Sequence, residues 1–233
     1  MRDSGFIRTI PYRFERKYEI SMADAENIAN RLRHVMRFDS HANETGHYTV
    51  RSLYFDNLYN TALYEKSNGV NRRSKYRIRI YDGCTDKILL EDKQKHDNMC
   101  YKLSTLLTKE QCERLIAGEF DWLSQSDHSL LLSLYERMLR GYRPKCIIEY
   151  DRQVFICDQS NVRVTIDKNI RSTYRTKEFL LPRISGVRAP LDNWAILEVK
   201  YDHFLPIHIR NALQTGYLTQ EAVSKYVLGR IYY

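Results

Sequence analysis

Basic side chains recur at every second position in one short segment of the sequence. Residues 75–79 read KYRIR, so that Lys75, Arg77 and Arg79 alternate with Tyr76 and Ile78. This alternation is typical of a β-strand, whose successive side chains point to opposite faces. Guanidinium and ammonium groups on one face suit phosphate oxygens, because arginine donates bidentately and lysine supplies a compact charge. The segment therefore indicates an anion-binding strand.

Carboxylates join the basic residues in two further alternating segments. Residues 12–20 place Arg13, Glu15 and Lys17 on one strand face. Residues 194–202 place Glu198 and Lys200 on one strand face. A few carboxylates among cations are what a divalent metal needs, since Mg²⁺ and Mn²⁺ prefer oxygen ligands and often bridge to phosphates. These residue types indicate a ligand made of a phosphate chain and a metal ion.

The overall charge also indicates an anionic partner. The 233 residues include 37 Lys and Arg against 29 Asp and Glu, which gives a formal net charge of +8. Such an excess favours nucleic acid, a membrane surface or a phosphorylated small molecule. Hydrophobic residues make up 43% of the sequence, which argues against intrinsic disorder.

Several classes of protein are disfavoured by the motifs that the sequence lacks. The sequence has no 18-residue apolar run and no hydrophobic signal core at its start, so we expect no transmembrane helix and a cytoplasmic protein. Its five cysteines form no CxxC pair, which disfavours a disulfide framework or a zinc site. Neither a Walker lysine motif nor a Rossmann glycine pattern is present, so common nucleotide-binding folds are disfavoured.

The elements that must position these residues are mostly strands of alternating polarity. No linker-like stretch divides the chain, so we expect one α+β domain over residues 1–233. An Asp82–Gly83 turn signal indicates that two of the strands form a hairpin. The expected strands cover residues 12–20, 48–56, 74–82, 87–95, 100–103, 145–157, 162–168 and 194–202.

Six helices are expected between and after the strands. Ser21 is a candidate N-cap for the first, and Thr108 begins the third with a sequence like a capping box. Gly118 and Gly141 are placed to end two of them. The expected helices cover residues 22–36, 57–65, 108–118, 127–140, 206–213 and 219–230.

The pattern leaves two arrangements of the charged strand faces open. One is a half-exposed sheet with a solvated charged face. The other is a closed barrel, in which helices cover the apolar outer faces and the charged faces surround a wet lumen. The lumen would then hold Arg13, Glu15, Lys17, Arg77, Arg79, Glu91, Lys93, Arg152, Arg163, Asp167, Glu198 and Lys200.

Eight segments, in order, carry a resemblance to a known family. They are FERKYEI (14–20), VRSLYFDN (50–57), KYRIRIY (75–81), LLEDKQKHD (89–97), IEYDRQVF (148–155), VRVTIDKNI (162–170), ILEVKY (196–201) and VSKYVLG (223–229). With these segments the sequence resembles the VTC domain, the polyphosphate-polymerase branch of the triphosphate tunnel metalloenzymes. The resemblance implies a closed antiparallel eight-stranded β-barrel, with helices packed outside and a basic tunnel within.

The resemblance also implies roles for individual residues. The sequence departs from the wider superfamily's opening ExExK pattern, because Arg13 stands where the first glutamate would be. This departure fits a chain-binding polymerase better than a two-metal triphosphatase, and it leaves Glu91 with no clear role. The implied catalytic residues are Lys17, Arg77, Arg79, Lys93, Arg152 and Arg163; the implied substrate-binding residues are Arg13, Lys102, Lys200 and Lys225; and the implied metal ligands are Glu198 and Glu15.

The implied activity is transfer of the ATP γ-phosphate to a polyphosphate chain, with Mn²⁺ or Mg²⁺ as cofactor. ATP and polyphosphate, or another triphosphate, would be the partners, and a membrane partner is possible because eukaryotic relatives act beside membrane-spanning proteins. Two alternatives stay open: a tunnel triphosphatase that hydrolyses tripolyphosphate or nucleoside triphosphates, and a non-catalytic polyphosphate-binding module. Nucleic acid is not expected, since most of the tyrosines alternate as apolar-face residues and core packing explains them.

Overall fold

One strongly curved antiparallel sheet organises the chain. The computed structural model describes residues 13–96, 99–188, 193–214, 217–221 and 223–231. Its eight main strands follow the spatial order β1-β10-β8-β7-β3-β4-β5-β6, while a short β2 pairs with β7 and a short β9 with β8. The strands are β1 (Phe14–Ser21), β2 (Arg37–Phe38), β3 (His47–Asp56), β4 (Arg72–Tyr81), β5 (Cys84–His96), β6 (Met99–Leu107), β7 (Arg143–Cys157), β8 (Val162–Thr173), β9 (Val187–Arg188) and β10 (Trp194–Tyr201).

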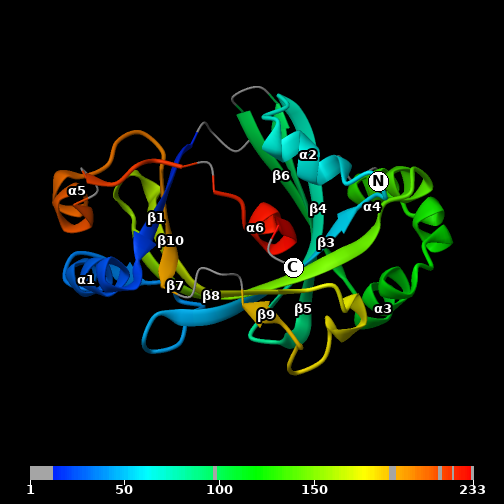
Figure 1. Ribbon diagram of the computed structural model, residues 1–233, viewed down its shortest axis with the longest axis horizontal. Coiled ribbons are helices and arrows are strands. Elements are labelled where there is room, and N and C mark those ends of the chain that lie inside the picture. Colours follow the sequence, from blue (N-terminus) through cyan, green and yellow to red (C-terminus); the bar gives the residue numbers. More distant parts are fainter. Residues whose placement is uncertain (1–12, 97–98, 189–192, 215–216, 222, 232–233) are drawn as a thin grey trace, which may run out of the picture.

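Helices pack at both ends of the curved sheet, and one lies inside the curve. In Figure 1, α1 and α5 lie together beside β1 and β10, whereas α3 and α4 lie at the opposite end, and α6 occupies the middle. The α-helices are α1 (Met22–Leu32), α2 (Thr61–Ser67), α3 (Lys109–Ala117), α4 (Ser129–Leu139), α5 (Ile207–Leu213) and α6 (Lys225–Ile231), and short 3-10 turns cover Asp121–Gln125, Gln159–Asn161 and Thr176–Glu178. Among the helices described, none is long and apolar enough to cross a membrane.

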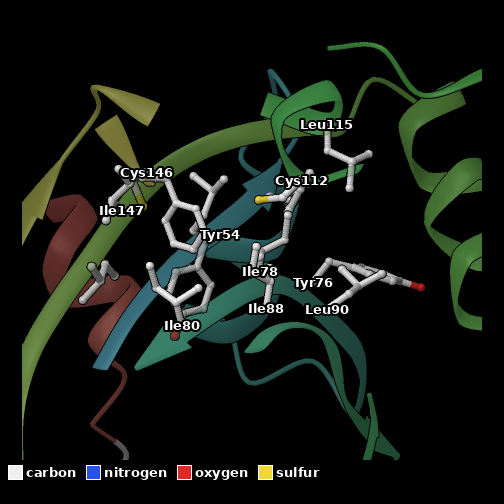
Figure 2. Packing of buried hydrophobic residues seen from close by; sticks show 14 of the residues in the cluster. Tyr54, Tyr76, Ile78, Ile80, Ile88, Leu90, Cys112, Leu115, Cys146 and Ile147 are labelled. Atoms are coloured by element: carbon white, nitrogen blue, oxygen red, sulfur yellow. The ribbon is translucent and has the colours of Figure 1, made fainter. Parts of the chain in front are cut away.

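One part of the larger hydrophobic core lies between the convex face of the sheet and helices α3 and α4, and another part reaches α6 through Tyr226. On β4 the even-numbered Tyr76, Ile78 and Ile80 are buried in this core, and Figure 2 shows part of the cluster that they share with Cys112 and Leu115 of α3. Because strand side chains alternate, this burial turns the odd-numbered basic residues of β4 to the concave face. The core therefore positions the charged face.

A second core cluster fixes the other end of the sheet. Tyr18 and Ile20 of β1 pack with Leu197 of β10 and with Ile28 and Leu32 of α1. The Ser21 side chain accepts a hydrogen bond from the backbone N–H of Asp24 and so caps α1, as the sequence predicted. The odd-numbered residues of β1 consequently face the same concave space as those of β4.

The α+β class and the expected strands are confirmed, whereas three helices differ from their predicted bounds. Helix α1 ends at Leu32 and not at residue 36, α2 begins at Thr61 and not at residue 57, and the last helix begins later than predicted. Helix α6 starts at Lys225 and not at residue 219. The segment before it runs along the free edge of β1, where Gln220 forms a bridge with Tyr18 and the Glu221 backbone N–H donates to the Lys17 carbonyl at 2.9 Å. The backbone groups that a longer helix would need are used by this edge.

The hydrogen-bonded closure of the predicted barrel is not confirmed. Strands β1 and β6 form the two ends of the strand path, and no ladder joins them within the described residues. The sheet nevertheless curls far enough for Lys93 of β5 to reach Glu15 of β1, with Nζ 3.6 Å from Oε2. A side-chain contact spans the gap, and Gln220 and Glu221 cover part of the β1 edge that a closing strand would occupy.

Candidate functional site

The concave face of the sheet lines a hollow of about 1360 Å³. Pockets for drug-sized ligands measure about 300–1,000 Å³, so this hollow can take a larger ligand. All twelve side chains to which the sequence assigned a site role line it, and their roles stay predictions. They are Arg13, Glu15, Lys17, Arg77, Arg79, Lys93, Lys102, Arg152, Arg163, Glu198, Lys200 and Lys225. Glu91 and Asp167, which the barrel arrangement also placed in the lumen, are buried and are not among the lining residues.

Two carboxylates and three lysines meet where β1 and β10 pair. The register places Glu15 opposite Lys200 and Lys17 opposite Glu198. The Lys17 Nζ lies 2.8 Å from Glu15 Oε1 and 3.8 Å from Glu198 Oε1, and the Lys200 Nζ lies 2.9 Å from Glu198 Oε1. Lys93 completes the group from across the hollow. Cross-strand pairs of opposite charge thus hold both glutamates in the lumen.

Both glutamates are ionised at neutral pH in these surroundings. Burial by itself would raise the pKa of Glu198, but the ammonium groups of Lys17 and Lys200 hold it well below its usual range. The pKa of Glu15 is also lowered, because Lys93 and Lys17 outweigh the effect of its burial. Conversely, burial and the like charges of Lys17 and Lys200 lower the pKa of Lys93 to about 8, although Glu15 opposes the change.

The donor set fits a hard cation that arrives together with a phosphate ligand. Glu198 and Glu15 share Lys17 and Lys200 as partners, so their ionised carboxylates face a common space. Across the described part of the chain, no three acidic, histidine or cysteine side chains group as a metal site. Mg²⁺ is often bound by one or two carboxylates plus substrate phosphates, and this pair can supply that share of the ligands.

Glu91 acts as a buried anchor for the basic residues of β4. Its side chain is 1% exposed, and its Oε2 lies 2.7 Å from Arg77 Nε and 3.7 Å from Arg79 NH1. Lys102 of β6 reaches Glu91 Oε1 at 3.1 Å. Burial would raise the pKa of Glu91, but these three cations lower it to about 2. The residue for which the sequence indicated no clear role therefore positions three predicted site residues.

Asp167 anchors basic residues in the same way on the opposite wall of the hollow. Its fully buried carboxylate accepts hydrogen bonds from Arg152 Nε at 2.7 Å and from Arg152 NH2 at 2.8 Å. The Lys225 Nζ, at the start of α6, lies 2.6 Å from the same carboxylate. Burial opposes ionisation, yet Arg152 and Lys225 keep the pKa of Asp167 below its ordinary value. Asp167 thus links the last helix to the wall of the hollow.

Two arginines lie nearer the rim, and each is held by an aspartate that the sequence did not assign to the site. Arg163 NH1 lies 2.9 Å from Asp39 Oδ2, and its NH2 donates to the Tyr48 hydroxyl at 3.0 Å. Arg13 Nε lies 3.1 Å from Asp202 Oδ1. Asp39 was missed because it flanks a strand and no alternation marks it. Asp202 ends the period-two row of Glu198 and Lys200 in the expected strand 194–202, so the alternation could have found it.

Further lining residues were missed as site residues. The basic ones among them are Arg16, Lys66, Arg73, Lys75 and Lys95. Lys75 belongs to the period-two row that the sequence marked as anion-binding, although no individual role was assigned to it. Arg73 extends this row by one more position, so the alternation could have found it. Six tyrosines also line the hollow, although the sequence placed most tyrosines in the core: Tyr48, Tyr54, Tyr81, Tyr101, Tyr150 and Tyr226.

A curved antiparallel sheet around a basic hollow defines the structural class of this protein, and two solved structures share its fold. One is a "putative adenylate cyclase" from Bacillus halodurans, with a TM-score of 0.55, 15% identity, and coverage of 92% of this chain and 94% of that one. The other is a "putative adenylyl cyclase" from Hippeastrum with "a dominant" triphosphatase activity, with a TM-score of 0.52, 13% identity, and coverage of 94% and 95%.

The sequence pattern of the VTC domain matches residues 12–232, so the chain belongs to the VTC domain family. This finding confirms the resemblance on which the site residues were assigned. A comparison with curated proteins found no match.

Proposed function

We propose that the protein is a phosphotransferase that moves the γ-phosphate of ATP onto a polyphosphate chain inside the basic hollow. The observation that supports it most is the imbalance of charge on the lining. Fifteen lysine and arginine side chains line the hollow against three glutamates. Such a wall repels itself unless a polyanion neutralises it, and a phosphate chain offers anionic oxygens along its whole length.

The reaction asks the protein mainly to position its substrates and to neutralise charge. A terminal oxygen of the acceptor chain attacks the γ-phosphorus in line, the bond to the β–γ bridging oxygen breaks, and ADP leaves with that electron pair. The acceptor oxygen is already anionic, so no general base is required. Arg77, Arg79 and Arg152 are the best-placed phosphate ligands, because buried carboxylates fix their guanidinium groups before substrate arrives.

Lys17, Lys200 and the two lumen glutamates would serve the metal-assisted part of the site. When bound to Glu198 and Glu15, Mn²⁺ or Mg²⁺ supplies charge neutralisation on phosphate oxygens. Lys17 and Lys200 keep both carboxylates ionised and in place.

Hydrolysis is the second candidate, and a specific observation favours it. The Hippeastrum protein that shares the fold has a triphosphatase activity. In that reaction water accepts the phosphoryl group and no chain grows. The size of the hollow and its surplus of cations favour a chain as acceptor over a single water molecule.

The test is the ratio of ADP to orthophosphate that the protein forms from ATP in the presence of Mn²⁺. The purified protein is incubated with both, and ADP and orthophosphate are quantified over time. A polymerase yields ADP in large excess over orthophosphate, whereas a triphosphatase releases orthophosphate in step with ADP. Glu198→Gln is the matched variant, because it keeps the shape of the side chain and removes a metal ligand. Equal amounts of ADP and orthophosphate would contradict the proposal.

A further inference from the structure

The register of β4 and β5 divides the wall of the hollow into two parts. In the inner part, Arg77 lies opposite Glu91, a pair of opposite charges. In the outer part, Arg73 lies opposite Lys95 and Lys75 lies opposite Lys93. All of these basic residues line the hollow. Directly opposed like charges destabilise a sheet. Glu15 of β1 compensates Lys93, and the other three outer cations need a counter-charge that β4 and β5 do not supply.

The inner cations are compensated by carboxylates of the described residues, whereas three of the four outer cations are not. Arg77, Arg152 and Lys225 each contact a buried carboxylate. For Arg73, Lys75 and Lys95, by contrast, no ion pair with a carboxylate is found in the described ranges.

The contacts of Lys75 illustrate the difference. Its Nζ lies 3.3 Å from Ser224 Oγ and 5.3 Å from the centre of the Tyr226 ring. Burial, together with Lys66, Arg73 and Lys93, lowers the pKa of Lys75 to about 7. An ammonium group among other cations is what an arriving anion would stabilise.

We propose that Arg73, Lys75 and Lys95 form a second anion subsite, beside α2, that binds the distal part of a linear phosphate chain. The inference rests on the proposed function in that it names the substrate class as chains longer than a triphosphate. This subsite selects substrates by length, because only a long chain can contact it and the inner arginines together.

The geometry of β4 supports the separation of the two subsites. Four basic residues, Arg73, Lys75, Arg77 and Arg79, follow one face of the strand. At about 3.3 Å per residue, the row from Arg73 to Arg79 spans about 20 Å. Arg73, Lys75 and Arg77 are partly exposed, whereas Arg79 at the other end of the row is 7% exposed. The inner subsite therefore includes the most buried residue of the row, and Arg73 of the outer subsite lies farthest from it.

The test compares the binding of two phosphate ligands without ATP or metal. Tripolyphosphate and a size-selected long-chain polyphosphate are titrated calorimetrically into the wild type, into the double variant Lys75→Gln/Lys95→Gln, and into Lys87→Gln. Lys87 is the matched control, because it lies on β5, is exposed and does not line the hollow. Single-stranded DNA is titrated as a second long polyanion.

The double variant is expected to lose about tenfold or more in affinity for the long chain, with a shallower dependence on salt, because two phosphate contacts are gone. Its affinity for tripolyphosphate should change less than about twofold, since a ligand held by the inner arginines does not reach the outer pair. Lys87→Gln should bind both ligands as the wild type does. The double variant should unfold at the same temperature as the wild type or higher, because it relieves like-charge repulsion.

Equal losses for both ligands, or no loss for either, would overturn the second subsite. Tighter binding of DNA than of polyphosphate at this wall would also overturn it, by making nucleic acid the occupant. Because no turnover is measured, the result is independent of the reaction. If the double variant loses affinity only for the long chain and the protein has no polymerase activity, the second subsite stands and the proposed function falls. If the protein has polymerase activity but the affinity loss does not depend on chain length, only the second subsite falls.

Discussion

Two buried carboxylates, Glu91 and Asp167, stand behind the cationic wall of the hollow. Each fixes at least two basic side chains at salt-bridge distance, and each is fully or almost fully buried. Holding the donors in place before substrate binds means that little reorganisation is needed when negative charge arrives. At the residue scale, the wall depends on anchors that touch no substrate.

Replacing Glu91 by glutamine should weaken both the fold and the site. The amide cannot compensate Arg77 and Arg79, and loss of one partner of a buried ion pair costs about 3–5 kcal/mol. We expect the free energy of unfolding in urea to fall by that order, and the KM for the triphosphate to rise more than kcat falls. Glu113→Gln, on the exposed face of α3, is the control. Unchanged stability would contradict the anchoring role.

The lowered pKa of Glu91 also predicts how the stability of the fold depends on pH. The pKa of Glu91 is lowered from 4.5 to about 2, so its contribution is fully present above pH 4.5 and is lost as the pH falls towards 2. The shift corresponds to about 3 kcal/mol. Urea unfolding between pH 5 and pH 2 should therefore show a shallower loss of stability for Glu91→Gln than for the wild type. Parallel pH curves for the two proteins would refute the assignment.

At the scale of elements, the free edge of β1 decides how the hollow is closed. The segment before α6 pairs with this edge through Gln220 and Glu221, and α6 then delivers Lys225 to Asp167. The segment therefore covers part of the β1 edge and forms part of the wall of the hollow. An uncovered edge strand would present unpaired backbone groups to other chains.

Substituting Glu221 by proline tests this cover, since it removes the N–H that donates to the Lys17 carbonyl. We expect a loss of about 1–3 kcal/mol for the unsatisfied backbone group, seen as a lower midpoint of thermal unfolding. Tripolyphosphate affinity should also fall, because Lys17 lies on the freed edge. Glu221→Ala keeps the N–H and is the matched control. If alanine and proline behave alike, the backbone contact is not what matters.

The sequence predicted the elements whose signals are local and missed those set by distant contacts. The alternation in β4 and the Asp82–Gly83 turn lie within a few residues, so the hairpin and its basic face could be read directly. The late start of α6 could not be predicted from local sequence, because it depends on pairing with β1, some 200 residues earlier in the chain.

The same distinction applies to the site. All twelve assigned side chains line one hollow, because alternation and the family motifs mark them. The anchoring role of Glu91 was not predictable, since its partners come from two strands and its burial depends on the packed helices. Asp39 was missed for the same reason, because only the folded chain brings it to Arg163.

At the scale of the whole molecule, a hollow lined mainly by cations repels itself until an anion enters. A ligand that binds only the folded state at 100 times its Kd adds about 2.7 kcal/mol to the free energy of unfolding. For a chain of this length, we expect tripolyphosphate to raise the unfolding midpoint by roughly 5–10 °C. Arg77→Ala should reduce that shift, whereas Lys87→Gln should keep it. An equal shift from sulfate at matched ionic strength would show that the hollow has no preference for a phosphate chain.

Primer extension shows whether the γ-phosphate of ATP is joined to a phosphate chain. A short polyphosphate of defined length is incubated with the protein, Mn²⁺ and ATP labelled on the γ-phosphate, and the products are separated by gel electrophoresis. We predict that the label enters a ladder of chains longer than the primer, and that Glu198→Gln abolishes the ladder. Label found only in orthophosphate, with the primer unchanged, would contradict the account.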